Sequence, residues 1–164
     1  MSPRVVVSAQ SAHPVDLDDL FTTVVDFAAY PQQCHDVVDV QVHQSGETVT
    51  SDWTVAFRGG LLKWSESDDT DHAHRVTTFD QISGDFAVFK GGWKVYAIDD
   101  GPATVEFDAV FDIGIASLAD LLNPVAGRAL VENVTSMLIG IVGSDADIRS
   151  RIENDAITAV PTTV

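Results

Sequence analysis

The sequence predicts an α+β fold in which a curved antiparallel sheet wraps around a long C-terminal helix. Six β-like segments follow one another from Val37 to Asp112, an apolar helical segment runs from Ser117 to Gly143, and a pair of glycines interrupts the longest β-like segment. A chain of 164 residues, 45% of them hydrophobic, is long enough to bury one sizeable core. We therefore expect a single domain over residues 1–164, with its core at about 4–143 and a polar tail, 145–164, that frays.

A short strand and an amphipathic helix open the chain. The strand is predicted from Arg4 to Ala9. Pro14 suits the first turn of a helix, and the three aspartates that follow it favour the positive end of the helix dipole. Apolar residues then recur at helical spacing: Leu17, Leu20, Phe21, Val24 and Ala28. We expect this helix to end near Tyr30-Pro31.

Period-two alternation dominates the middle of the chain. The six segments are "VVDVQVHQ", "TVTSDWTVAF", "LLKWSES", "RVTTFDQI", "FAVFKGGWKVYAI" and "ATVEFDAVFDI". They are separated by turn signals: Ser45-Gly46, Gly59-Gly60, "DDTDHA", Ser83-Gly84 and "DDGPA". Six strands in succession predict an antiparallel meander.

The pair Gly91-Gly92 lies inside the fifth segment, in "GDFAVFKGGWKVY". A hairpin at this point would leave two very short strands, whereas a bend within one long strand lets the sheet curve around the C-terminal helix. We predict the bend. In the helical segment, Pro124 either kinks the helix or starts it, and we expect it to start the main helix after a short turn.

The charge of the chain excludes several classes of partner. The formal net charge is −16, so an acidic surface would repel nucleic acid and anionic membranes. Both a salt-adapted host and an ordinary acidic cytosolic protein fit this balance. Cys34 is the only cysteine, which excludes an intrachain disulfide. Because the sequence carries no continuous run of about 18 apolar residues and no signal-peptide pattern, we expect a cytoplasmic protein without membrane insertion.

Three motifs, in this order of elements, resemble a known superfamily. They are "VVDFAAYPQ" at Val24 to Gln32, "LLKWSES" at Leu61 to Ser67 and "GDFAVFKGGW" at Gly84 to Trp93. Over roughly Val5 to Val142 the chain resembles the START-like, Bet v 1-like (SRPBCC) superfamily, and within it the polyketide cyclase/dehydrase and coenzyme-Q-binding group. The resemblance implies a helix-grip fold with an internal hydrophobic cavity that takes a polyketide, lipid or quinone.

Strand alternation independently gathers apolar and aromatic side chains on one concave face. We expect the following to bind the ligand: Trp53, Phe57, Trp64, Phe86, Trp93, Phe107, Phe111 and Met137. The alternative is that these side chains simply fill the core.

Four polar residues are candidate catalytic groups: Glu66, Asp80, Lys90 and Tyr96. Glu66 shares a strand face with Trp64, and a carboxyl group in an apolar cavity has a raised pKa that suits it to proton transfer. A Lys90 partner would oppose that shift, and such a pair would also fit a structural or solvent-facing role. Tyr30 fits a structural anchor better than a hydrogen-bond donor to the ligand.

Two other groups of residues are weaker candidates for a functional site. Cys34 and His35 are neighbours in sequence, but adjacent side chains rarely point at each other. His72 and His74 lie among aspartates and could collect a divalent metal, although a solvated turn explains them as well. The chain has no glycine-rich phosphate loop, and we expect no metal and no cofactor.

Three functions remain open from the sequence. The first is an enzyme that cyclises or dehydrates a bound polyketide-like chain. The second is a noncatalytic carrier of a lipid, quinone or isoprenoid. For aromatase/cyclase chemistry, the resemblance implies an Arg inside the cavity near "LLKWSES". This chain has Leu61, Leu62 and Lys63 there, so the noncatalytic carrier remains a strong alternative. The third is a protein-interaction module that uses the outer sheet edge and helix.

Overall fold

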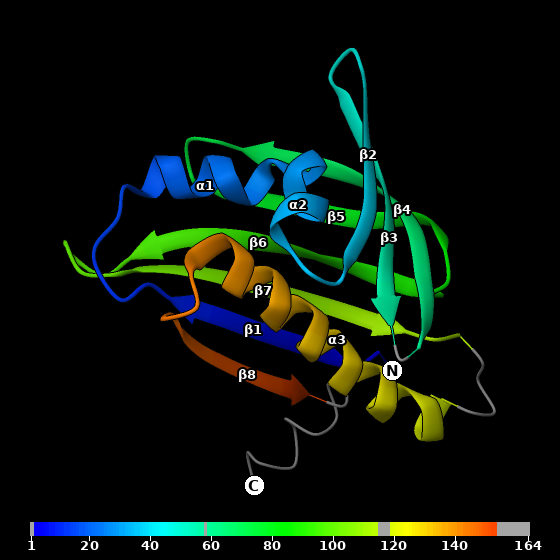
Figure 1. Ribbon diagram of the computed structural model, residues 1–164. Helices are drawn as coiled ribbons and strands as arrows, with labels where there is room; N and C mark the ends of the chain where they lie inside the picture. Colours follow the sequence, from blue (N-terminus) through cyan, green and yellow to red (C-terminus); the bar gives the residue numbers. More distant parts are fainter. Residues whose placement is uncertain (1, 58, 115–118, 154–164) are drawn as a thin grey trace, which may run out of the picture.

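One antiparallel sheet of eight strands forms the body of the protein (Figure 1). The computed structural model describes residues 2–57, 59–114 and 119–153, with side chains undescribed at 119–121. The strands are β1 Arg4–Gln10, β2 Val37–Ser45, β3 Thr48–Phe57, β4 Gly60–Asp71, β5 Val76–Gly84, β6 Val88–Ala97, β7 Ala103–Asp112 and β8 Asp147–Glu153. The helices are α1 Leu17–Val25, a 3₁₀ turn η1 Phe27–Ala29, α2 Tyr30–Gln33 and α3 Ala119–Val142.

The predicted meander is confirmed, because β2 to β7 pair in sequence order and every pairing is antiparallel. β1 then pairs with β7 on one side and with β8 on the other. The expectation that the tail frays is wrong for Asp147–Glu153. There the side chains of Ile148 and Ile152 pack against the core. The backbone of this segment pairs with β1 and so satisfies backbone N–H and C=O groups of β1 that would otherwise be unpaired.

Helix α3 crosses the concave face of the sheet (Figure 1). It packs on β1 and β7, and also on β3 and β8, which lie near opposite edges of the sheet. A helix can touch both edges only if the sheet curves around it, so the predicted α+β helix-grip architecture is confirmed. The buried face of α3 carries Ala126, Ala129, Leu130, Val134 and Leu138.

Pro124 lies inside α3, five residues after its first residue, so the prediction that it starts the helix is wrong. Its missing N–H removes one hydrogen bond, which packing of α3 on the sheet offsets. The segment Leu122–Val142 has a mean hydropathy of 1.4, enough by length and composition to cross a membrane. In this fold the segment is part of α3, the helix around which the sheet curves.

The N-terminal helix is shorter than the sequence indicates. The side chain of Asp16 accepts a hydrogen bond from the backbone N–H of Asp19 at 2.9 Å, which caps α1 at Leu17 rather than near Pro14. At Asp26 the backbone leaves the helical region, and the chain continues as η1 and α2. The single helix predicted to Tyr30-Pro31 is therefore divided into three helical pieces: α1, η1 and α2.

The glycine pair lies within one continuous strand, β6, as predicted. A Cβ atom on Gly91 would lie 2.0 Å from the carbonyl oxygen of Asp108 on β7, and one on Gly92 would lie 2.8 Å from the carbonyl oxygen of Thr77 on β5. Only glycine permits this close approach of the neighbouring backbones.

Candidate functional site

Aromatic rings fill the space between the sheet and α3. Trp53 on β3 and Trp64 on β4 are register partners whose indole rings stack with centroids 5.6 Å apart. The ring of Phe89 on β6 meets that of Trp64 edge-on at 5.2 Å. Of the side chains predicted to bind the ligand, all are buried except Phe57, which is half-buried and packs against the core.

A small cavity of about 20 Å³ remains among these rings. Its lining is Trp53, Trp64, Glu66, Phe79, Phe89, Trp93, Phe107, Leu130, Val134 and Met137. It therefore includes five of the predicted ligand-binding residues and adds Phe79, Phe89, Leu130 and Val134. The volume holds about one water molecule, whereas a small-molecule pocket takes about 300–1,000 Å³. The cavity is where the sequence placed it, but the rings must separate before a ligand can enter.

Glu66 points into this cavity from β4, as predicted. It is 3% exposed, and its Oε1 accepts a hydrogen bond of 2.7 Å from Nε1 of Trp64. A register shift between Ser65 and Glu66 marks a β-bulge in the pairing of β4 with β5, a feature that re-aims side chains beside functional sites. Burial raises the pKa of Glu66 well above its ordinary value, and the neighbouring Asp68 carboxyl raises it further. Hydrogen bonds from Trp64 and Ser51 act on the pKa in the opposite direction.

Asp68 is a member of the site that the sequence did not identify. It lies two residues after Glu66 on the same strand and therefore on the same face. Its Oδ2 accepts a 2.6 Å hydrogen bond from the hydroxyl of Ser51, which in turn accepts a 2.8 Å bond from Nε1 of Trp53. The sequence prediction had placed Asp68 in the turn "DDTDHA", but β4 continues to Asp71. The signal that could have found it is the period-two continuation of Trp64 and Glu66.

The other three candidate catalytic residues lie outside the cavity. Asp80, Lys90 and Tyr96 are exposed on the outer face of β5 and β6, because the neighbouring residues Phe79, Phe89 and Val95 take the inward positions. Asp80 and Lys90 are register partners there. The expected approach of Lys90 to Glu66 is therefore wrong, since the two side chains point to opposite faces of the sheet.

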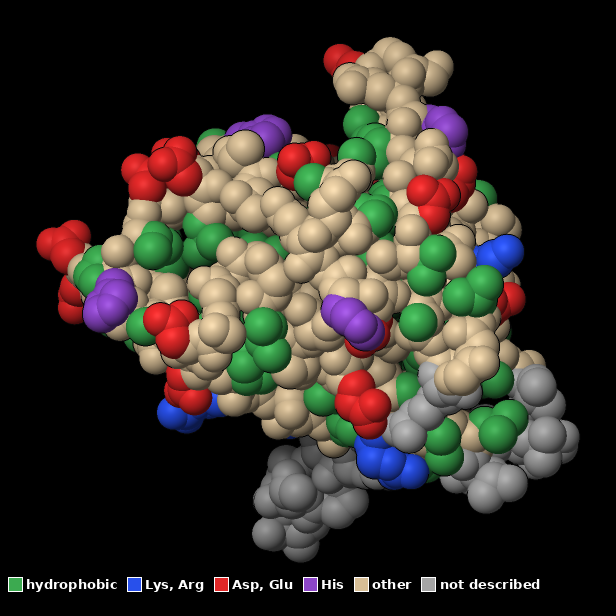
Figure 2. Space-filling model, viewed as in Figure 1, with side chains coloured by type: hydrophobic (Ala, Val, Ile, Leu, Met, Phe, Trp, Pro, Cys, Tyr) green, Lys and Arg blue, Asp and Glu red, His purple; other side chains and the backbone are tan. Residues whose placement is uncertain are grey.

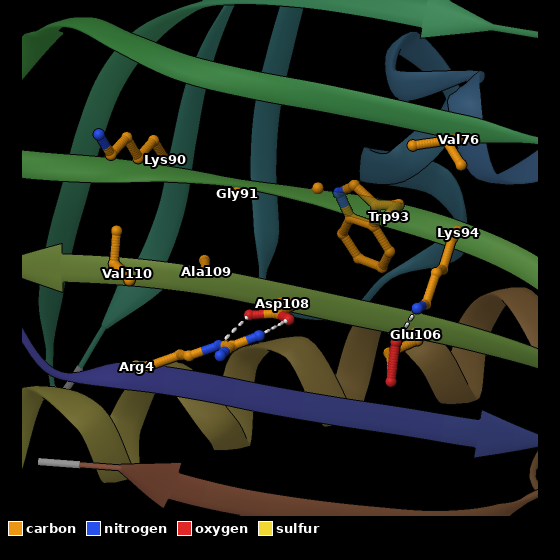
Figure 3. A pocket seen from close by; sticks show the side chains of 11 residues that line it. Arg4, Val76, Lys90, Gly91, Trp93, Lys94, Glu106, Asp108, Ala109 and Val110 are labelled. Atoms are coloured by element: carbon orange, nitrogen blue, oxygen red, sulfur yellow. Dashed lines mark hydrogen bonds and ion pairs between the residues drawn. The ribbon is translucent and has the colours of Figure 1, made fainter. Parts of the chain in front are cut away.

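A shallow hollow of about 420 Å³ lies on this outer face, over the glycine pair (Figure 3). Lys90 extends along one side of it, Arg4 donates from Nε to Asp108 at 2.7 Å, and Lys94 forms a 3.0 Å ion pair with Glu106. The hollow is larger than the inner cavity, but backbone forms its floor, and four of its charged groups neutralise one another in pairs.

Two further candidates have structural roles. Tyr30 is fully buried, and its hydroxyl donates to the carbonyl of Val24 at 2.5 Å, which fits the predicted anchor. Burial raises the pKa of this phenol well above its ordinary value. Cys34 is buried with its Sγ 3.7 Å from the carbonyl of Met137, while the His35 ring is exposed beside Asp36. The two neighbours do not form a thiolate pair.

Among the described side chains, those of residues 2–57, 59–114 and 122–153, no group of three His, Cys, Asp or Glu is arranged to hold a metal ion. His74 bonds to Asp71 at 2.8 Å, and the ring of His72 meets that of Phe21 edge-on at 5.6 Å. What the inner site offers chemically is a buried carboxyl group among aromatic rings, able to donate or accept one proton.

The surface contrasts with this apolar interior. Figure 2 shows Asp and Glu side chains scattered over the face that carries the helices, with Lys and Arg at its margins. This distribution agrees with the net charge of −16 and gives an anionic polymer no basic face to bind among the described residues on this side.

The family model described as "Polyketide cyclase / dehydrase and lipid transport" matches residues 13–138. Among curated proteins, none matches the chain in sequence. Solved structures share its fold. The protein TTHA0849 from Thermus thermophilus is 21% identical with a TM-score of 0.75, over 84% of this chain and 93% of that protein.

Two other solved structures are similarly related. A START superfamily protein from Mycobacterium smegmatis is 16% identical, with a TM-score of 0.69 over 85% of this chain and 97% of its own. The Zhui aromatase/cyclase from Streptomyces sp. R1128 is 17% identical, with a TM-score of 0.67 over 83% of this chain and 92% of its own. At these identities the likeness establishes the fold.

Proposed function

The chain belongs to the polyketide cyclase / dehydrase and lipid transport family, with a START-like fold, and we propose that it binds a hydrophobic, oxygenated small molecule between its sheet and α3 and promotes cyclisation or dehydration of that molecule. In this proposal the protein acts in the cytoplasm. Its ligand class is a polyketide-like chain, a lipid or a quinone.

The observation that carries the proposal is the Glu66 carboxyl, 3% exposed in the wall of an aromatic cavity. A carboxyl group held in this way keeps its proton at a pH where an exposed one has lost it. It can then give the proton to a ligand oxygen and take one back from carbon, as general acid and general base.

In a dehydration, the Glu66 carboxyl protonates the departing hydroxyl, which leaves as water. The resulting carboxylate removes a proton from the adjacent carbon, so Glu66 ends in its starting state. In a cyclisation, the same carboxyl protonates the carbonyl oxygen while an enol carbon of the same chain attacks that carbonyl, and the resulting carboxylate takes the proton that the enol hydroxyl releases as it becomes a ketone. The surrounding rings restrict the chain to folded conformers, which lowers the entropic part of the barrier.

Ligand entry requires the interior to open. The cavity holds about one water, so a ligand must displace rings from their stacked positions or shift α3 away from β3. The binding energy available from contacts with the three indole rings has to exceed the energy of separating them.

A specific feature of the lining favours noncatalytic carriage as the second candidate. Among the described residues that line the cavity, Glu66 is the one ionisable side chain, and none is Lys or Arg. A carrier needs only an apolar space with one polar group to orient its cargo, whereas an enzyme that develops enolate charge gains from a cation near that charge.

The experiment that separates the two candidates begins with native mass spectrometry of gently purified protein, which identifies a bound molecule. Turnover and affinity are then measured with that molecule for Glu66→Gln and for the outer-face control Glu106→Gln. For an enzyme, Glu66→Gln abolishes product formation while affinity stays within about tenfold, or about 1.4 kcal/mol. Unchanged turnover would remove Glu66 from the mechanism, and absence of any turnover in the wild type would favour the carrier.

A further inference from the structure

The carboxyl groups of Glu66 and Asp68, on the inner face of β4, are both neighbours of the Ser51 hydroxyl on β3. Ser51 is the register partner of Glu66 on β3, and its hydroxyl donates to Asp68 Oδ2 at 2.6 Å. A hydrogen bond with the neighbouring Asp68 carboxyl is one of the causes that raise the pKa of Glu66. The two stacked tryptophans complete a hydrogen-bonded framework around both acids. Nε1 of Trp53 donates to Ser51, and Nε1 of Trp64 donates to Glu66.

One oxygen of this framework lacks a donor. Asp68 Oδ1 is buried, and no N–H or hydroxyl of the described residues donates to it. A buried acceptor without a donor costs about 1–3 kcal/mol. The Glu66 carboxyl, two residues away on the same face of β4, can supply the missing hydrogen only while it holds a proton.

Among the described residues, no cation near the pair opposes this arrangement. The elements packed around it contribute Ser51 and Trp53 from β3, Phe79 from β5, and Leu130, Val134 and Met137 from α3. The titratable groups that face Glu66 are Asp68 on its own strand and Tyr30 on α2, whose hydroxyl is already committed to a backbone carbonyl. Lys90 lies on the outer face.

We infer that Glu66 and Asp68 share one proton at neutral pH, so that the interior presents a neutral carboxylic acid and selects neutral ligands with a ketone or quinone oxygen over ligands that carry a carboxylate. Asp68 acts in this as a positioning residue, because it holds the proton on Glu66. A carboxylate ligand would enter a space with no counter-charge and meet the remaining negative charge of the pair.

The ligand half of this inference rests on the proposed function, since it requires the interior to open. The shared proton does not depend on ligand binding. Infrared spectroscopy of the free protein at pH 7.5 tests it directly, because a protonated carboxyl group absorbs apart from ionised carboxylates. We expect one such band in the wild type, its loss in Glu66→Gln, and its disappearance at a lower pH in Asp68→Asn than in the wild type.

The matched control for this measurement is Asp80→Asn, which removes an exposed carboxylate from the outer face and should leave the band and its pH dependence unchanged. Absence of a protonated carboxyl band in the wild type at pH 7.5 would overturn the inference. So would a band that survives in Glu66→Gln, because the proton would then belong to another group.

Selectivity is tested with two probes of the same ring size, 2-acetylnaphthalene and 2-naphthoate, by quenching of tryptophan emission at pH 7.5. The wild type is expected to bind the ketone at least tenfold more tightly than the carboxylate. In Asp68→Asn the carboxylate should gain about tenfold while the ketone changes by less than about threefold. Equal affinities in the wild type would overturn the selection and leave the proposed function standing. Binding of neither probe would count against the proposed function and against selection, while the infrared band would still decide the shared proton.

Discussion

The indole rings of Trp53 and Trp64 lie parallel, with 4° between their planes and 5.6 Å between their centroids. They are direct register partners on β3 and β4, and each donates its N–H to a side chain two residues away on its own strand, to Ser51 and Glu66 respectively. The stack therefore does more than fill space. It fixes the orientation of the groups that carry the polar chemistry of the interior.

Replacing Trp64 with Phe tests this coupling. The change removes the 2.7 Å hydrogen bond to Glu66 and part of the stacked area. We expect the free energy of unfolding, measured with urea, to fall by about 1–3 kcal/mol. Trp93→Phe removes similar atoms from the same cavity without touching the Glu66 bond, and it should cost about 1 kcal/mol less. Equal losses in the two variants would show that packing alone holds the indole.

The glycine pair gives a prediction with a clear steric cause. A methyl group on Gly91 would be placed 2.0 Å from a backbone oxygen of β7, and backbone cannot step aside as a flexible side chain can. Gly91→Ala should therefore destabilise the protein by about 3 kcal/mol or more. Gly60→Ala is the control, since the nearest atom to its added methyl lies at 3.8 Å, and its effect should stay within about 0.5 kcal/mol. Thermal melts followed by circular dichroism measure both, and a tolerated Gly91→Ala would contradict the close approach.

The number and order of the strands in the meander were predictable from the sequence, and for one strand the bounds were as well. The segment "TVTSDWTVAF" coincides with β3, Thr48–Phe57, because strict alternation is bounded by turns at both ends. The pocket followed from the same alternation, since a strand that buries Trp64 also buries Leu62 and Glu66.

The errors have equally local causes. A catalytic role for Asp80 and Lys90 would need both side chains on the inner face. In β5 and β6 the inner positions belong to Phe79 and Phe89, and a shift of one residue along a strand moves a side chain to the opposite face. Asp68 was missed because three aspartates in "SDDTDH" resemble a solvated turn, while the ladder with β5 in fact extends to Asp71. Strand β8 was missed because only Ile148 and Ile152 mark its inner face. The volume of the cavity depends on side-chain packing, which strand patterns do not specify.

The thiol of Cys34 should be unreactive in the folded protein. Burial raises the pKa of its thiol to about 11, so almost none of it is thiolate near neutral pH, and its side chain is 3.7 Å from the Met137 carbonyl inside the core. We expect Ellman's reagent at pH 8 to label it only at the rate at which the protein opens, with labelling accelerated by urea. Fast labelling in the absence of denaturant, with an unchanged circular dichroism spectrum, would contradict the burial.

The last prediction concerns stability and pH through Glu66. Its pKa in the folded protein is raised by burial and by Asp68, so as pH rises the unfolded chain loses this proton before the folded protein does. The contribution of Glu66 to stability is therefore fully present below the ordinary glutamate pKa and is lost as pH rises through the raised folded value. Gln cannot ionise, so Glu66→Gln removes this dependence.

We expect the midpoint of thermal unfolding of Glu66→Gln, relative to the wild type, to rise steadily from pH 5 towards pH 9. The outer-face control Glu106→Gln, at a residue 3.0 Å from Lys94, leaves the interior unchanged and should not reproduce this trend. Differential scanning calorimetry across this pH range measures both variants. A constant difference between Glu66→Gln and the wild type would mean that Glu66 titrates alike in the folded and unfolded chain, and an opposite trend would mean that the fold stabilises its ionised form.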